Sequence, residues 1–515
     1  MTMQFFLPTG YSAPALLVVI AGAFLCIYIR RVVARARFAQ LHGCRPVAKS
    51  LSKDPFLGLD ALPGTIRSLV QHKMLEQNCE LFNTYGNTFT LKELHKKIIL
   101  TIEPENIKTV LSLRFSDFGI GHRLAAFKPL LGEGIFDTDG DHWASSRALV
   151  RPSFTRDQLA DLSSLECLFQ DLVAVLPRDE QTVVDLQPLF FCYTLDSATE
   201  FLFGQSAGTL KTPPGQNTFA QAFQDAQRAI IARTTLGWLS VLYRDRKASE
   251  GTRICRDFAA RLVDEAFETV RNGEKEQPQH KQGELRRQKY ILAHELASRT
   301  SDRKRVLDEL MNVLLAGRDT TASLLSNLFF VLAQNPTIWE KLRREVSDLG
   351  QRPPTYEELR GLEYVQCCLN ESLRLHPVVP RNQRQALCDT VLPLGGGKDG
   401  SSPVFVRKGT FVAYNIYAMH RRTDIYGPDA AVFRPERWRE ADLRPRWGYL
   451  PFNGGPRVCL GQRYALTEAG YVLVRMVQHF QKLESRELGP WEESLALTLC
   501  PRNGTSVSGA CLDCA

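Results

Sequence analysis

The longest apolar periodicity in the chain predicts one long buried helix. From residue 303 to residue 334, leucines and other apolar residues recur at helical spacing, and the middle of this stretch is apolar on nearly every face. At about 1.5 Å per residue, such a helix would be roughly 45–50 Å long, enough to cross a whole domain. A second helical pattern covers residues 462–480. We therefore expect a long helix in the middle of the fold.

Strand-like segments are few and short, whereas residues 65–95 and 155–200 contain helical apolar spacing. The glycine run 395–400 lacks the GxxxxGK[ST] frame of a phosphate loop, so it predicts a turn between strands. The fold class is therefore mainly α with small β-sheets. The expected strands are 88–91, 98–102, 404–406 and 410–414.

The N-terminal hydrophobic segment predicts a membrane anchor. Residues 11–29 are uncharged and apolar, nearly the 20 residues that a spanning helix needs. Four arginines follow directly, whereas residues 1–10 carry no charged side chain, so the positive flank is expected to stay cytosolic. A cleaved signal peptide would place its positive charge before the apolar run. We predict a lumenal tip and anchor (1–29), a basic hinge rich in Pro and Gly (30–64) and a catalytic domain (65–515).

Composition narrows the class of protein further. The formal net charge of +8 suits an acidic partner or an anionic membrane surface, but no basic helix indicates nucleic-acid binding. Thirteen cysteines lack framework spacing, and the CxxC of Cys511 and Cys514 has no second ligand pair. A reduced, cytosol-facing domain without a structural zinc site follows. The charged stretch 271–290 is expected to be an exposed connector.

Chemistry enters with a cysteine in a glycine-rich loop, FNGGPRVCLG at residues 452–461. Glycines let the backbone turn tightly so that amide groups can point at the Cys459 sulfur, and the following helix favours an anion at its N-terminus. A lone cysteine in such a loop is more often a structural thiol. The complete pattern FxxGxRxCxG, however, resembles the haem-binding loop of the cytochromes P450. The resemblance implies haem b bound through Cys459 as the axial ligand of its iron, with Phe452 beside it.

A second motif is Glu371-Ser-Leu-Arg374, whose i,i+3 spacing places a carboxylate and a guanidinium on one helical face. Alone, an ExxR pair is common on protein surfaces and weak. The resemblance implies that this pair binds Arg437 of the FRPERW segment, giving a buried triad that supports the cysteine loop.

The middle of the long helix reads AGRDTT, residues 316–321, and places charged and hydroxyl groups in an apolar helix. Burying such groups without partners costs several kcal/mol, so they require an explanation, and an exposed face conflicts with the apolar surroundings. Gly317 leaves room for a small ligand. The resemblance implies that Thr320 donates a hydrogen bond to iron-bound dioxygen, that Asp319 supplies protons and that Ala316 lines the substrate pocket.

Further haem contacts are predicted from arginines, which pair with carboxylates through two parallel hydrogen bonds. Trp143 and Arg147 share one helical face at i,i+4 spacing. Each of these side chains by itself is more often a surface residue. The resemblance implies that they hold a haem propionate together with Arg384 and Arg457.

The resemblance spans essentially the whole chain and implies a monooxygenase that inserts one atom of O2 into a C–H bond of a lipophilic substrate. The chain has no flavin or nicotinamide motif of its own, so electrons from NADPH must arrive through NADPH–cytochrome P450 reductase, with cytochrome b5 as a further partner. A single-pass protein of the endoplasmic reticulum membrane, with its catalytic domain in the cytosol, follows. A haem-thiolate isomerase or dehydratase would not need Asp319 and Thr320, and a haem sensor would need no electron donor.

At a finer level, the segments 115–121, 129–136 and 417–428 and the AGRDTT helix resemble fungal n-alkane and fatty-acid terminal hydroxylases. Terminal attack requires a narrow pocket above the iron, and the β-branched Val378 and Val379 could form it or pack in the core. Arg123 or Arg502 could bind a substrate carboxylate. Gln383 adds a polar residue near the pocket wall. The alternative is a tailoring oxidase of a fungal secondary-metabolite pathway that makes a polyketide or terpenoid.

Overall fold

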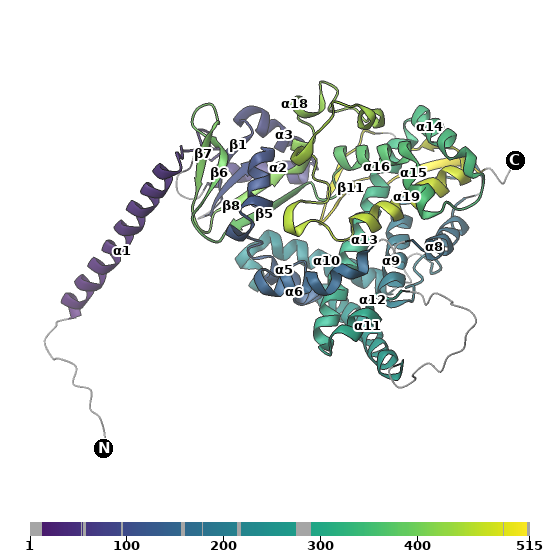
Figure 1. Ribbon diagram of the computed structural model, residues 1–515, viewed down its shortest axis with the longest axis horizontal. Coiled ribbons are helices and arrows are strands. Elements are labelled where there is room, and N and C mark those ends of the chain that lie inside the picture. The colour runs from purple at the N-terminus through teal and green to yellow at the C-terminus, as the bar shows by residue number, and fades with distance from the viewer. Residues whose placement is uncertain are drawn as a thin grey trace, which may run out of the picture.

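A computed structural model gives the fold (Figure 1). It describes residues 13–511 except 53, 55–57, 94–95, 156–159, 178, 214–217, 274–289 and 488. Three expectations fall on residues outside this description: the uncharged N-terminal tip, most of the connector at 271–290 and the second cysteine of the C-terminal CxxC.

The predicted central helix is α13, Arg303–Ala333, and it lies in the middle of the molecule (Figure 1). The Asp302 carboxylate caps it by accepting a hydrogen bond from the Arg305 backbone N–H. Nearly all of its apolar side chains are buried, as the pattern on every face predicted. It packs against α9 (Leu186–Phe203), α16 (Glu363–Leu375) and α19 (Gln462–His479).

Two hydrophobic clusters surround α13 and divide its length. One cluster joins its C-terminal half to α8, α9, α14, α16 and α19, and the other joins its N-terminal half to α5, α10, α11 and α12. The helices just named are α5 (Arg123–Leu131), α8 (Ser163–Ala174), α10 (Thr218–Leu236), α11 (Arg246–Gly273), α12 (Leu292–Arg299) and α14 (Pro336–Val346). The other helices of ten or more residues among the described residues are α1 (Ala13–Leu41), α3 (Met74–Tyr85) and α6 (Gly140–Val150).

Several short helices connect these elements within the described residues. They are α2 (Leu62–Val70), α4 (Pro104–Lys108), α15 (Tyr356–Gly361), α17 (Ile416–Met419) and α18 (Thr423–Tyr426), with 3-10 or π turns at Leu59–Ala61, Thr109–Leu113, Phe115–Asp117, Arg151–Phe154, Gly237–Leu242, Ser347–Leu349, Pro435–Arg439, Arg446–Gly448 and Gly455–Arg457.

The strands form small sheets, which confirms the predicted mainly α class with small sheets. The largest sheet has the order β1-β2-β8-β5-β3, with β2 and β8 parallel and its other pairs antiparallel. The four predicted strands correspond to β1 (Thr88–Glu93), β2 (Lys96–Thr101), β7 (Ser402–Val406) and β8 (Phe411–Asn415). The others are β3 (Phe118–Gly119), β4 (Val184–Asp185), β5 (Arg381–Ala386), β6 (Thr390–Gly396), β9 (Phe480–Ser485), β10 (Glu493–Leu495), β11 (Leu499–Pro501) and β12 (Ser506–Cys511).

Strands β5 and β6 were not predicted from the sequence, for different reasons. The β5 sequence RNQRQA is almost entirely polar, so it shows no alternation of apolar residues, yet it pairs with β8 through the backbone. The glycine run was predicted as a turn between strands. It is one, but β6 extends into its first two glycines before the chain returns in β7.

The N-terminal helix α1 projects away from the rest of the fold (Figure 1). The most apolar part of its span Leu16–Leu41 has a mean hydropathy of 2.2, and none of that part is buried in the protein. It is the one helix among the described residues that is long and apolar enough to cross a bilayer.

Candidate active site around Cys459

The cysteine loop is built by close backbone contacts that exclude larger residues. The Cys459 backbone N–H donates to the Phe452 carbonyl over 3.0 Å, which closes the loop. Gly455 has φ +67°, and a Cβ there would lie 1.8 Å from the Leu111 carbonyl oxygen. A Cβ at Gly454 would lie 2.6 Å from the Trp447 ring. The two glycines therefore fix the loop against the neighbouring segments, and the positive φ of Gly455 gives the tight turn that the motif predicts.

The Cys459 side chain is accessible to solvent, although many protein atoms lie around it. Burial raises its pKa, whereas the Gly461 backbone N–H and the Arg147 charge act in the opposite direction. The protein alone therefore does not stabilise the thiolate fully. A bound metal ion would supply the missing positive charge, because coordination deprotonates a thiol. An accessible sulfur that faces one backbone donor fits a haem iron.

The predicted triad of Glu371, Arg374 and Arg437 is formed and fully buried. Arg374 binds Glu371 through two parallel hydrogen bonds of 2.9 and 2.8 Å, and Arg437 Nε binds the same carboxylate at 2.8 Å. Each guanidinium also donates to backbone carbonyls, so both arginines use all their N–H groups. These acceptors are the carbonyls of His420, Ala430 and Val432 for Arg374, and of Tyr426, Asp429 and Val432, with the Asp429 carboxylate, for Arg437.

His420 joins this triad to the cysteine loop, a link that sequence analysis did not find. Its Nε2 accepts the Leu450 backbone N–H at 2.9 Å, so its proton must lie on Nδ1, which donates to the Arg374 carbonyl at 3.1 Å. Burial lowers the pKa of His420 to about 3. The neutral imidazole thus connects α16 with the chain two residues before Phe452.

An accessible strip interrupts the buried helix α13 at the AGRDTT motif. Ala316 is exposed and Gly317 and Thr320 are half-buried, whereas the apolar residues on either side of the motif are buried. The Thr320 hydroxyl donates to the Ala316 carbonyl over 2.6 Å. A hydroxyl held in this way keeps its lone pairs free to accept a second hydrogen bond. Thr320, the residue predicted to bind oxygen, therefore lies on one accessible face of α13 with Ala316, which was predicted to line the pocket.

Asp319 faces away from that strip into a buried charged cluster. Arg318 Nη1 donates to its carboxylate at 2.8 Å, and the Gln227 side-chain amide donates to the other carboxylate oxygen. The same amide accepts from Arg318 Nη1 at 3.2 Å. Burial raises the pKa of Asp319, although Arg318 and Gln227 oppose this shift.

Gln227 comes from α10 and was missed by sequence analysis. Its signal is a polar residue on the apolar face of a helix, because Phe223 and Ile230, four residues before and three after it, are buried. The Arg318 guanidinium also lies over the Phe191 and Phe223 rings, at 5.0 and 5.4 Å from their centroids.

The arginines predicted to bind haem propionates gather with Trp143. The Arg457 and Arg147 guanidinium carbons lie 4.5 and 5.9 Å from the Trp143 ring centroid, and Arg384 is buried on β5. Burial, with the repulsion of Arg384, Arg123 and Arg147, lowers the pKa of Arg457 to about 10, which Asp139 partly offsets. Such an excess of positive charge fits two propionate groups.

Arg123 belongs to this arginine group, which sequence analysis had not recognised. It donates to the Asn382 side chain at 3.0 Å, and Arg384 donates to the same oxygen at 3.1 Å. Burial and Arg384 lower the pKa of Arg123 to about 10. Arg502, the other candidate for a substrate carboxylate, is exposed and pairs with Glu492 at 2.9 Å.

Val378 and Val379, the two pocket candidates that follow α16 in the chain, differ in how deeply they are buried. Val378 is buried, and its carbonyl accepts the Leu499 backbone N–H at 3.0 Å. Val379 is only partly buried and packs against the same core. Gln383 is exposed on β5. A role for the valines in the pocket therefore stays a prediction.

A mainly helical fold, an accessible thiol in a glycine-stabilised loop, a buried ExxR network and an arginine group beside it define a haem-thiolate protein. Residues 62–505 match the family model described as Cytochrome P450. The chain is 46% identical over 500 residues to the cytochrome P450 monooxygenase himC of Aspergillus japonicus, covering 95% of this chain and 89% of that protein.

Two further relatives are the cytochrome P450 monooxygenase FPY7 of Fusarium mangiferae, 44% identical over 94% of this chain and 95% of that protein, and cytochrome P450 52A3-B of Candida maltosa, 41% identical over 88% of this chain and 89% of that protein. The chain belongs to the cytochrome P450 family of monooxygenases. Membership implies haem iron, O2, a redox partner that supplies electrons and a lipophilic substrate.

Proposed function

We propose that this chain hydroxylates a C–H bond of a lipophilic substrate, with Cys459 as the axial ligand of the haem iron. When bound, haem with a thiolate ligand supplies the oxidising chemistry and favours cleavage of the O–O bond. The observation that carries the proposal is the accessible Cys459 sulfur in a loop whose Gly461 N–H faces it. Arg147, Arg384, Arg457 and Trp143 would hold the propionates, and Phe452 would lie beside the ring.

The residues of α13 have different roles in the remaining chemistry. Thr320 would donate a hydrogen bond to the O2 substrate, for which its hydroxyl would rotate away from the Ala316 carbonyl that accepts it in this structure. Asp319 would supply protons to the site, because burial raises its pKa and so lets it hold a proton that an exposed carboxylate would have lost. Ala316 would leave space for the substrate. These assignments disfavour a haem-thiolate isomerase or a haem sensor, neither of which needs a proton relay.

For the substrate, we propose terminal hydroxylation of a fatty acid or an alkyl chain. The resemblance of the segments at 115–121, 129–136 and 417–428 to terminal hydroxylases supports it, and so do Val378 and Val379 behind α16. The himC and FPY7 relatives favour the second candidate equally, a fungal secondary-metabolite oxidase acting on a polyketide or terpenoid.

We further propose that α1 anchors the chain in the endoplasmic reticulum membrane with the catalytic domain in the cytosol. The uncharged apolar span followed by four arginines supports this orientation. Electrons would then come from NADPH through NADPH–cytochrome P450 reductase, with cytochrome b5 as a further donor.

The haem ligand is tested by the carbon monoxide difference spectrum of reduced microsomes. The red-shifted Soret band of a thiolate-ligated haem should appear with the wild-type chain and disappear in Cys459→Ala and Cys459→His. Cys167→Ala, at an exposed cysteine on α8, is the matched control and should keep the band. A band that survives in Cys459→His would overturn the assignment.

The substrate class is tested with the purified chain, the reductase and NADPH. Fatty acids, n-alkanes, and polyketide and terpenoid scaffolds are offered separately, and the position of the new hydroxyl group is identified by mass spectrometry. Oxidation at the terminal methyl group of the linear substrates supports the first candidate. Turnover confined to the polyketide or terpenoid scaffolds supports the second candidate.

A further inference from the structure

The segment that follows the membrane span is bound to the catalytic domain along its length. Helix α1 continues past its uncharged apolar run, which ends at Ile29, for about 18 Å to Leu41. The helix is exposed from Leu16 to Ala34, and its first half-buried residues after that are Arg35, Phe38 and Ala39. Their i, i+3 and i+4 spacing places them on one face. That face meets the domain.

Two side-chain contacts join this face to the β6–β7 region. Arg35 Nε donates to the Asp389 carboxylate at 2.9 Å, and both side chains are only about a quarter exposed, at 26% and 28%. The other Asp389 oxygen accepts a hydrogen bond from the Lys408 backbone N–H at 2.7 Å, so this second hydrogen bond holds the carboxylate in position for Arg35. The Phe38 ring packs edge-on against Phe405 of β7, with the ring centroids 5.8 Å apart.

Backbone hydrogen bonds continue the attachment after the helix ends. The Arg45 N–H donates to the Pro403 carbonyl at 2.8 Å, and the Gly397 N–H donates to the Pro46 carbonyl at 3.0 Å. Further along, the Leu51 N–H donates to the Thr90 carbonyl at 2.9 Å, so the segment adds to the edge of β1.

Gly396 makes the close approach possible. A Cβ at this position would lie 2.5 Å from the Pro403 carbonyl oxygen and 2.7 Å from that of Arg45. Any larger residue would force the segment and the β6–β7 hairpin apart.

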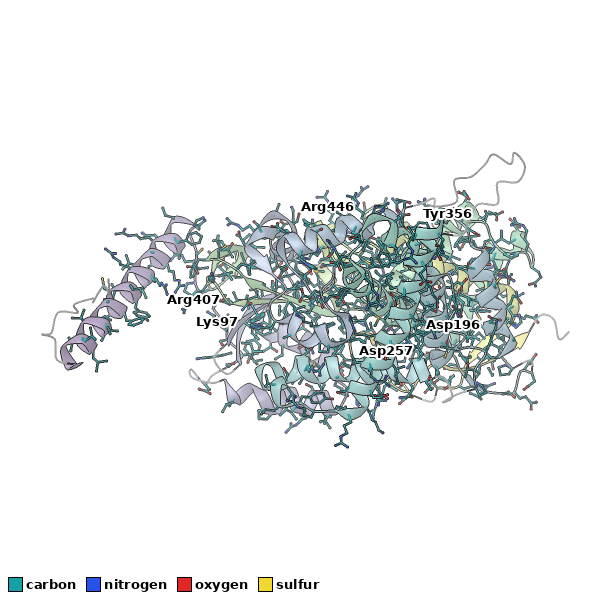
Figure 2. All side chains as sticks on the ribbon, turned by 90° about the horizontal axis from the view of Figure 1, so that it is seen from below. Lys97, Asp196, Asp257, Tyr356, Arg407 and Arg446 are labelled. Carbon is teal, nitrogen blue, oxygen red and sulfur yellow. The ribbon has the colours of Figure 1, made fainter. Side chains whose placement is uncertain are left out.

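The basic residues of this end add a charge argument. Lys97 and Arg407 lie at the end of the molecule from which α1 emerges (Figure 2), and both are exposed. A basic surface on that side matches the anionic cytosolic face of a bilayer.

We propose that Arg35, Phe38 and residues 44–51 form a rigid strut which docks on the β6–β7 hairpin and holds the catalytic domain in one orientation against an anionic membrane. The residues from Arg35 to Leu51 would then be fixed to the domain, and the hinge predicted at 30–64 would be confined to the residues outside this strut. The proposal rests on the proposed insertion of α1 into the membrane. The attachment itself consists of contacts within the chain and needs no haem.

Hydrogen exchange on the full chain in nanodiscs containing phosphatidylserine tests the strut directly. The amides of Arg45, Leu51 and Gly397 should exchange as slowly as those of the β1–β2 pair, because all are bonded to backbone carbonyls. Gly396→Ala should speed the exchange of Arg45 at least tenfold. Exchange of Arg45 and Leu51 in the wild type at the rate of an unstructured chain would overturn the proposal.

The orientation is tested by linear dichroism of the CO-bound haem in oriented bilayers. The double variant Arg35→Gln/Phe38→Ala should reduce the dichroism at least twofold, because it removes both side-chain contacts while the anchor remains. Arg37→Gln is the matched control, since Arg37 is exposed on the same helix, and it should leave the dichroism unchanged. Equal dichroism in the double variant and the wild type would contradict the strut.

Failure of the underlying proposals gives different signals. A chain that floats free of nanodiscs would refute membrane insertion, and a chain without a CO band would refute haem binding. Slow exchange at Arg45 and Leu51 would be expected in either case, because those hydrogen bonds lie within the protein.

Discussion

Two buried carboxylates, Glu371 and Asp319, lie in unlike surroundings. Glu371 accepts from two arginines, the Trp438 indole and the Arg434 backbone N–H, and both arginines use every donor they have. Asp319 has one arginine and one amide. In its cluster the Arg318 Nε finds no hydrogen-bond partner among the described residues.

The difference teaches how to separate a structural network from an adjustable one. A buried ion pair is stable only when additional hydrogen bonds satisfy both charges, as around Glu371. Desolvation dominates at Asp319 and raises its pKa, which makes the group able to change protonation. The first network maintains the cysteine loop, and the second fits a relay.

Replacing Glu371 should have the largest effect. Glu371→Gln leaves Arg374 and Arg437 buried without their counter-charge, which costs about 3–5 kcal/mol of unfolding free energy. We expect little haem-thiolate protein in the CO difference spectrum and a much lower urea midpoint. Glu250→Gln is the control, because Glu250 and Arg253 form an exposed pair of the same i,i+3 spacing, and it should leave the midpoint unchanged. A Glu371→Gln variant as stable as the wild type would mean that the network is dispensable.

Asp319→Asn should reduce product formation about 100-fold, within the range of a general acid or base, while the CO band keeps its position and height. Stopped-assay product analysis and spectral titration of one sample separate the two readouts. Ser326→Ala is the control, since Ser326 is a buried hydroxyl further along α13 that bonds to the Ala322 carbonyl. Product formation within twofold of the wild type would remove Asp319 from proton supply.

Gln227→Leu should have a smaller effect, a loss of roughly tenfold in product formation. The amide donates to the Asp319 carboxylate and lowers its pKa, so its removal should raise that pKa further. The Asp319-dependent limb of the pH profile should therefore move to higher pH. Gln221→Leu, at an exposed position of α10, is the matched control. An unchanged pH profile in Gln227→Leu would show that this amide does not act on Asp319.

The smallest expected effect is a difference in response to acid. Because burial lowers the pKa of His420 to about 3, the native state binds fewer protons there than the unfolded state below pH 6.5, and stability should fall by about 1 kcal/mol per pH unit of acidification. Asp319 has a raised pKa, so above 3.8 the native state binds more protons, and its contribution to stability should improve as the pH falls.

Urea unfolding at pH 7.5 and 5.5 measures both contributions by difference. His420→Gln should lose less stability than the wild type on acidification, and Asp319→Asn should lose more. The same change of unfolding free energy with pH in all three proteins would mean that each group binds as many protons in the folded as in the unfolded state over this range.

Much of the fold and part of the site could be predicted from local pattern. The apolar residues between 303 and 333 predict α13 because their spacing is helical on every face, and the glycines of the Cys459 loop predict its turns because glycine adopts backbone angles that other residues avoid. Strand β5 could not be predicted, since its pairing uses the backbone and its side chains are polar.

The sequence by itself determined the central helix, the apolar span, the cysteine loop and the residues of the ExxR motif, because each depends on neighbours within a few turns of chain. Only the tertiary structure decided that Gln227 reaches Asp319, that His420 links Arg374 to Leu450, and that Arg123 joins the arginine group. These contacts join residues as far as 92 and 259 positions apart. A hydrogen bond across such a separation depends on how whole helices pack, and no periodicity in the sequence records it.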